Sequence, residues 1–147
     1  MKIEIQEDSA LTETEVVIRC RHTDAQVLKM LASLRAYDQK ITGTRDGQTY
    51  PLEAEDILYI DTVDKKTFFY TRSEVYETQL RLYELEDRLA ACDFFRASKS
   101  AIVNFGHIRS MRPDFGGRLR LTMTNGEAVF VSRQYVPAVR EKLGMNG

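Results

Sequence analysis

The chain has 147 residues, of which 43% are hydrophobic and 29% charged, and its formal net charge is −1. This composition excludes a disordered chain, and the length suits one domain, or one domain with a short extension. The charged N-terminus lacks the apolar region of a signal peptide, and the apolar run at 57–60 is far too short for a membrane span. A small secreted disulfide scaffold usually carries more cysteines than the distant pair Cys20 and Cys92, so the sequence favours a reduced cytoplasmic protein.

The charge is unevenly distributed. Residues 88–147 hold ten Lys and Arg against four Asp and Glu, whereas residues 1–87 hold eleven against eighteen. A basic surface on a nearly neutral protein can bind phosphate, because the field of distant charges is screened within about 8–10 Å at physiological salt. The alternative interpretation is that surface charge is simply uneven.

The first 40 residues predict a small β-β-α unit. Residues 2–6 and 14–20 alternate apolar and polar side chains, which is typical of strands. Thr23 and Gln26 have the spacing of a capping box, and apolar residues at helical spacing then predict a helix over about 24–36. We expect this unit to pack on the remaining residues, to dimerise, or to dock a partner.

From residue 41 onward the pattern predicts mainly short strands with two helices. Asp46-Gly47 and Asn125-Gly126 each lie between strand-like segments, which predicts two hairpins. Buried strands are predicted at 57–60 and 67–71, and further strands at 94–98, 101–104 and 107–111. Helices are predicted around residues 82–89 and from Pro137 to Gly144.

No motif in the sequence predicts catalysis. The Cys20-x-His22 pair has no second pair to complete four metal ligands, and His107 near a strand start fits a turn residue better than a general base. Phosphate-binding glycine loops, nucleophile elbows and HExxH are missing from the sequence. The sequence therefore predicts neither an enzyme, nor a metal site, nor a cofactor, nor a small-molecule substrate.

Four motifs occur in order along the second part of the chain. They are DILYI at 56–60, LYELEDRL at 82–89, FFRASKSAIVN at 94–104, and NG at 125–126 followed by VSRQY at 131–135. In combination they resemble the LytTR family of bacterial DNA-binding domains over residues 41–144. The resemblance implies a mainly β fold with short helices, in which small antiparallel sheets form an elongated domain over 41–147, preceded here by the β-β-α unit over 1–40.

The resemblance also implies which residues contact DNA. Members of this family insert loops from strand ends into successive major grooves of duplex DNA. The matching positions, with the serines and the arginine that flank them, are Lys65, Lys66, Thr67, Arg96, Ser98, Lys99, Ser100 and Arg133. Lysines suit phosphate or guanine acceptors, and arginine can bind a guanine edge or a phosphate with two hydrogen bonds. Arg96 has two interpretations, a phosphate contact or an ion pair with an acid.

The expected function is a sequence-specific transcription regulator that binds promoter repeats of double-stranded DNA as a homodimer or as tandem copies. The first 38 residues are too few for the receiver domain that many family members carry, and some short members are restrained by a small membrane protein, which is a possible partner here. The alternative is a protein-interaction module whose basic loops bind an acidic partner. Lys66-Thr67 and Lys99 replace residues common in the family, so base preference cannot be transferred.

Overall fold

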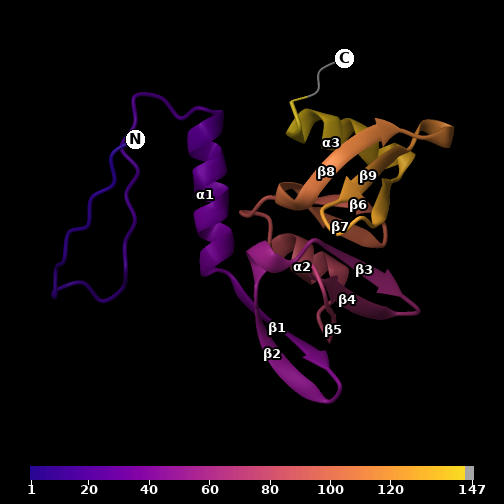
Figure 1. Cartoon of the computed structure of the whole chain (residues 1–147), viewed down its shortest axis with the longest axis horizontal. Helices are drawn as coiled ribbons and strands as arrows, with labels where there is room; N and C mark the ends of the chain where they lie inside the picture. The colour runs from indigo at the N-terminus through magenta and orange to yellow at the C-terminus, as the bar shows by residue number, and fades with distance from the viewer. Residues whose placement is uncertain (145–147) are drawn as a thin grey trace.

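The structure, a computed structural model, describes residues 1–144, apart from the side chains of Ala36 and Asp38. Residues 1–144 form two antiparallel sheets and three α-helices (Figure 1). This confirms the predicted mainly β class with short helices. None of the helices in residues 1–144 combines the length and apolar character that crossing a bilayer requires.

The N-terminal arm, residues 1–24, differs from the prediction. It forms no strand, so the strands expected at 2–6 and 14–20 were wrong, and of the β-β-α unit only the helix forms. This helix, α1 (Ala25–Asp38), is capped by Asp24 and not by Thr23, because Asp24 Oδ1 accepts a hydrogen bond from Val27 N at 2.9 Å. Helix α1 packs against the 3-10 turn η1 (Ala54–Asp56), while the arm stands apart from the β body (Figure 1).

The larger sheet has seven strands in the order β2-β1-β5-β4-β3-β7-β6. Each strand is antiparallel to its neighbours, and Asp46-Gly47 forms the β1–β2 turn as predicted. The sequence pattern had not indicated β5. The strands are β1 (Lys40–Arg45), β2 (Gln48–Glu53), β3 (Tyr59–Val63), β4 (Lys66–Tyr70), β5 (Val75–Thr78), β6 (Phe94–Ser98) and β7 (Ala101–Asn104).

The smaller sheet has three strands in the order β10-β9-β8. Its β9–β10 hairpin turns at the predicted Asn125-Gly126, where only Gly126 has a positive φ, of 89°. The C-terminal helix has Pro137 in its first turn and is followed by Gly144 at φ 71°, as predicted. The elements are β8 (Ile108–Pro113), β9 (Leu119–Met123), β10 (Ala128–Val131) and α3 (Val136–Lys142).

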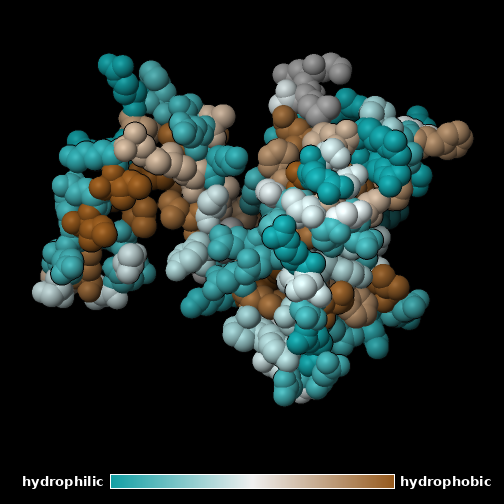
Figure 2. Space-filling model, in the orientation of Figure 1, coloured by the Kyte–Doolittle hydropathy of each residue, from teal (hydrophilic) through white to brown (hydrophobic). Residues whose placement is uncertain are grey.

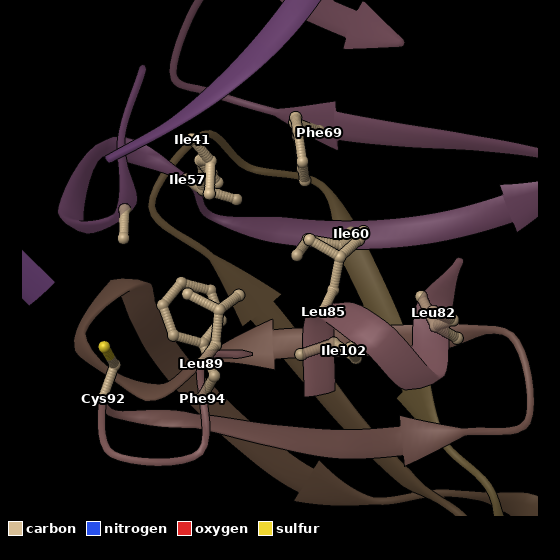
Figure 3. Close-up of a cluster of buried hydrophobic side chains, with 11 residues drawn as sticks. Ile41, Ile57, Ile60, Phe69, Leu82, Leu85, Leu89, Cys92, Phe94 and Ile102 are labelled. Carbon is tan, nitrogen blue, oxygen red and sulfur yellow. The ribbon is translucent and has the colours of Figure 1, made fainter. Parts of the chain in front are cut away.

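Two hydrophobic clusters bury opposite faces of the same strands. Helix α2 (Leu82–Arg88) covers one face of the larger sheet with Leu85 and Leu89, which are fully buried (Figure 3). The smaller sheet and α3 cover the other face. Strand β7 is buried on both sides, since Ile102 points into the first cluster and Val103 into the second. Strands β6 and β7 are thus held from both faces, which fixes the turn that joins them.

Candidate nucleic-acid interface

The β3–β4 turn presents two lysines. Asp64 and Lys65 form the turn with φ values of 51° and 66°, the left-handed conformation that a tight two-residue hairpin requires. Both are exposed, and so is Lys66, which begins β4. Lys66 Nζ lies 3.8 Å from Oε1 of the half-buried Glu77, a long contact that leaves the exposed ammonium accessible.

Thr67 is placed differently from the prediction. It is only 6% exposed, and its hydroxyl lies 3.2 Å from the hydroxyl of Thr62 on the neighbouring strand. A side chain buried in the sheet cannot reach a DNA duplex without opening the β3–β4 ladder. The burial of Thr67 argues against a direct contact, and Lys65 and Lys66 are the exposed cations of this turn.

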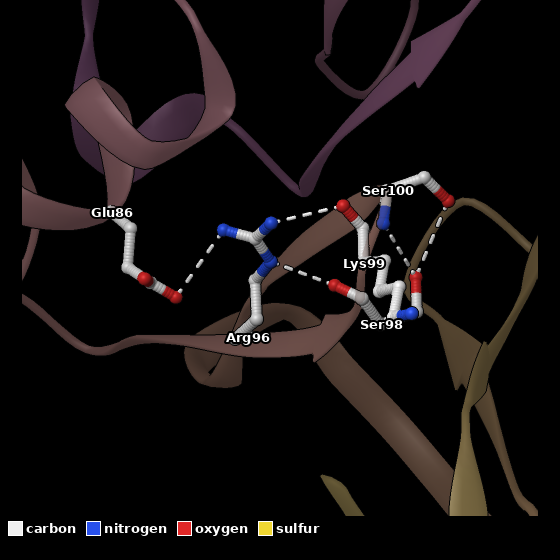
Figure 4. A network of polar contacts seen from close by, with 5 residues as sticks. All are labelled: Glu86, Arg96, Ser98, Lys99 and Ser100. Carbon is white, nitrogen blue, oxygen red and sulfur yellow. Dashed lines mark hydrogen bonds and ion pairs between the residues drawn. The ribbon is translucent and has the colours of Figure 1, made fainter. Parts of the chain in front are cut away.

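The β6–β7 turn is braced by Arg96 (Figure 4). The guanidinium donates from Nε to Ser98 O at 2.7 Å and from Nη2 to Lys99 O at 2.9 Å. Its third nitrogen, Nη1, lies 3.4 Å from Glu86 Oε2 on α2. Of the two interpretations of Arg96, the structure shows the ion pair with an acid, and Arg96 is a positioning residue for the turn.

The serines of this turn also bond locally. Ser98 Oγ accepts a hydrogen bond from Ser100 N at 3.2 Å and lies 3.4 Å from Ser100 Oγ. Ser98 is half-buried, whereas Lys99 and Ser100 are exposed. Arg96 binds the carbonyls of Ser98 and Lys99, which leaves the exposed side chains of Lys99 and Ser100 accessible to a ligand.

The two turns lie at the same end of the larger sheet. Strand β3 is paired with β4 on one side and with β7 on the other, and Asp61 faces Ala101 in the β3–β7 ladder. One step further, Thr62 N donates to Ser100 O at 2.9 Å. Because β3 leads into Asp64-Lys65 and β7 follows Ser100, the lysines of both turns lie at the same end of the strands, which we call the basic edge.

Arg133 is tied to the same end by its neighbour. Ser132 N donates to Ala97 O at 2.9 Å, and Ala97 lies in β6 two residues before Lys99. Arg133 begins the 3-10 turn η4 (Arg133–Tyr135) after β10. Its side chain is exposed and runs over Gly117, since a Cβ at Gly117 would lie 3.3 Å from Arg133 Cγ and Cδ. Three chain segments thus bring cations to one region.

The charges of this region are only partly neutralised. Lys65, Lys99 and Arg133 form no ion pair with any side chain that the structure describes, while Lys66 and Arg96 contact one glutamate each. Asp61 lies behind the turns in β3. Burial raises the pKa of the Asp61 carboxyl, and the Tyr70 hydroxyl partly offsets this by hydrogen bonding. The exposed cations at this end of the sheet, Lys65, Lys66, Lys99 and Arg133, still outnumber the exposed acids Asp64 and Glu86.

The outer face of the smaller sheet adds cations that the sequence analysis had not selected. Arg112 of β8 is directly opposite Arg120 of β9, and Arg120 is opposite the exposed Phe130 of β10. The guanidinium carbons of Arg118 and Arg120 lie 4.7 and 6.0 Å from the Phe130 ring centroid. The sequence signal that could have indicated this face is the alternation of arginine with leucine in RLRL at 118–121.

His107 and the nearby Asn104 make structural contacts. His107 Nε2 lies 2.6 Å from Glu55 O, which can only accept, so Nε2 carries the hydrogen. Asn104 is buried, donates to Ile57 O at 2.9 Å and accepts from Gly106 N at 3.0 Å, so it braces the turn that follows β7. His22 lies on the exposed arm, and no group of three or more metal-ligating side chains occurs among the described residues.

Comparison with known proteins identifies the family and the fold. The sequence-family model of the LytTr DNA-binding domain matches residues 47–144 of this chain. The solved LytTr DNA-binding domain of a Bacillus cereus protein is 31% identical and superposes with a TM-score of 0.68 over 71% of this chain and 96% of that one. The fold and the basic edge therefore define a DNA-binding domain of this class, and the chain belongs to the LytTR family.

Two curated relatives extend the comparison. The sensory transduction protein LytT of Enterococcus faecalis is 31% identical over 101 residues, which cover 69% of this chain and 42% of that protein. An uncharacterized HTH-type transcriptional regulator of Staphylococcus aureus is 25% identical over 147 residues and 99% of both chains. The helix-turn-helix wording of that name does not describe the present fold, because strands separate the three α-helices of residues 1–144.

Proposed function

We propose that this protein is a transcription regulator of the cytoplasm that recognises specific duplex DNA through three turns. The β3–β4 turn, the β6–β7 turn and η4 present Lys65, Lys66, Lys99 and Arg133 to the duplex. The observation that carries the proposal is the hydrogen bonding of Thr62 to Ser100 and of Ser132 to Ala97, which ties these three segments together. The turns occupy successive major grooves, where side chains can read base edges.

The chemistry of the four cations divides their roles. Lysine is a flexible point charge, so Lys65 and Lys66 suit phosphates, and each neutralised phosphate makes binding more salt-dependent. Arg133 presents a planar fork that can bind a guanine edge, which discriminates bases by about 1–3 kcal/mol for each bidentate pair. Ser100 lies beside Lys99 and can donate to a phosphate oxygen.

The test is duplex binding by single-site variants on a site selected from a random pool. We expect Lys99→Ala to weaken binding about tenfold and to reduce the salt slope by about one. We expect Arg133→Ala to weaken binding and to relax base preference at one position. Arg72→Ala is the matched control, because the exposed Arg72 lies in the β4–β5 turn at the opposite end of the same sheet.

Unchanged binding in Lys99→Ala and Arg133→Ala, or an equal loss in Arg72→Ala, contradicts the proposed interface. We further propose that the regulator acts on repeated sites as a homodimer or as tandem copies, since a second bound copy raises affinity through effective concentration. A small membrane protein that restrains it is a further proposed partner, tested by co-purification from detergent-solubilised membranes.

A further inference from the structure

The second half of the N-terminal arm is exposed and unpaired. Val16 and Val17 are 64% and 78% exposed, and they lie between Glu15 on one side and Arg19 on the other. Within residues 1–144, residues 13–21 make no backbone hydrogen bond. Figure 2 shows apolar side chains gathered over this arm, which stands apart from the body. A strand-like segment with open backbone groups is a template for pairing with another chain.

Pairing within the arm is electrostatically poor. The chain turns at Asp8, where Leu11 N donates to Asp8 O at 3.2 Å. A hairpin that continued from this turn would place Glu4 opposite Glu15 and Gln6 opposite Glu13. Residues 4–15 contain five acids and no Lys or Arg. Like charges directly opposite destabilise a ladder, so the same chain does not supply a good partner.

We propose that residues 13–21 of two copies of this chain pair as antiparallel strands about a twofold axis at Val17. In this register Glu15 of each copy faces Arg19 of the other, and Glu13 faces Arg21. Val16 faces Ile18, and the two Val17 residues face each other. All four charges of each segment thus meet opposite charges, and the same surface serves both copies, as a closed twofold dimer requires.

The two faces of the resulting ribbon differ. Because side chains alternate along a strand, one face carries the charged pairs and the other carries Thr14, Val16, Ile18 and Cys20. A two-stranded ribbon needs cover on its apolar face to be stable in water. Helix α1 follows the arm and exposes Leu28 at 55% and Leu34 at 39%, so the helices of the two copies can supply that cover.

This interface does not depend on DNA recognition, so it can be tested without DNA. The first experiment is oxidative crosslinking of the full chain carrying Cys20→Ser and Val17→Cys. Opposed residues have Cα atoms about 4.5–5.5 Å apart, within reach of a disulfide. We expect a covalent dimer. The buried Cys92 stays unchanged.

Glu15→Cys in the same Cys20→Ser background is the control. Residue 15 lies on the same face of the segment, but in the proposed register the two copies of residue 15 are offset by four residues, or about 13 Å. We expect it not to crosslink. Equal crosslinking at positions 15 and 17 overturns the register, and a monomer at tens of micromolar by sedimentation overturns the interface.

A charge exchange tests the proposed pairs in the intact fold. We expect Glu15→Arg alone, or Arg19→Glu alone, to weaken self-association about tenfold, because each places like charges opposite twice in the dimer. The double variant Glu15→Arg/Arg19→Glu should associate as the wild type does. A mixture of the two single variants should form heterodimers. If neither the double variant nor the mixture of single variants associates as the wild type does, the proposal is overturned. This outcome does not depend on how tightly these variants bind DNA.

Discussion

Arg96 shapes the β6–β7 turn without needing to touch DNA. Replacing it by lysine keeps the charge that faces Glu86 but loses the planar fork that binds Ser98 O and Lys99 O. We expect Arg96→Lys to lower the free energy of unfolding by about 1–2 kcal/mol, since two bonded carbonyls lose their partner. DNA affinity should fall severalfold at an unchanged salt slope, measured by denaturation and by salt titration.

Arg88→Lys is the matched control for Arg96→Lys. Arg88 is exposed in the last turn of α2, and the substitution conserves its charge in the same way. Neither stability nor affinity should change by more than a few tenths of a kcal/mol, as for most surface positions. A reduced salt slope in Arg96→Lys would instead make Arg96 a direct phosphate contact.

Asp61 makes stability depend on pH. Burial raises the pKa of its carboxyl above the value in the unfolded chain, so the folded state binds its proton more tightly. At pH values above the pKa of Asp61 in the folded state, the ionised carboxyl therefore lowers the free energy of unfolding. This destabilisation disappears once the pH falls below the pKa of Asp61 in the unfolded chain. We expect Asp61→Asn to be more stable than the wild type at pH 7, with a difference that shrinks towards pH 4.

Urea denaturation at several pH values measures this difference. Asp56→Asn is the control, because Asp56 is exposed in η1 and removal of its charge should not reproduce the pH trend. A stability gain in Asp61→Asn that stays constant between pH 7 and pH 4 would show that shape, and not charge, explains it.

At the scale of elements, the β3–β4 turn holds a non-glycine residue in a costly conformation. Lys65 has φ 66°, whereas Gly47 occupies the second turn position of the β1–β2 hairpin. We expect Lys65→Gly to stabilise the fold by about 0.5–1 kcal/mol and at the same time to weaken DNA binding. Thermal unfolding and duplex binding measure the two effects. Lys65→Ala should weaken binding equally without the gain in stability.

Local patterns predicted most elements of the β body. The bounds of β6 and β7 were predicted to the residue, because aromatic and branched residues flank a polar turn, and both glycine hairpins form. The alternation in residues 2–6 and 14–20 predicted strands that the structure lacks, since a strand needs a partner that the chain does not supply. Thr67 was misassigned because sequence proximity to a turn does not reveal burial in the ladder.

At the scale of the whole molecule, the candidate interface depends on the contact between the two sheets. Ala97 and Val103 of the larger sheet share a hydrophobic cluster with Leu121 and Val131 of the smaller one. This cluster places Arg133, which follows the smaller sheet, beside the turns of the larger sheet. The sequence could indicate three basic turns, but their convergence depends on sheet order, which is set by long-range packing.

The N-terminal arm and the basic edge together predict how affinity depends on the number of DNA sites. If the arms join two copies, a duplex with two repeats binds the pair with an effective concentration that a single repeat cannot exploit. We expect wild-type protein to prefer two repeats over one by about 10²-fold or more. Glu15→Arg should reduce this preference and leave single-repeat affinity within about twofold, because residue 15 lies on the arm and not at the basic edge.

Titration of one- and two-repeat duplexes by gel retardation measures that preference. Varying the spacing between the two repeats makes the test more specific. Two copies held by a twofold ribbon can bind without bending the duplex only when their sites face the same side, so affinity should peak at spacings that differ by about 10.5 base pairs. Glu15→Arg/Arg19→Glu should recover both the preference and the peak. A preference that survives Glu15→Arg would place the cooperative contact on the β body or in the DNA itself.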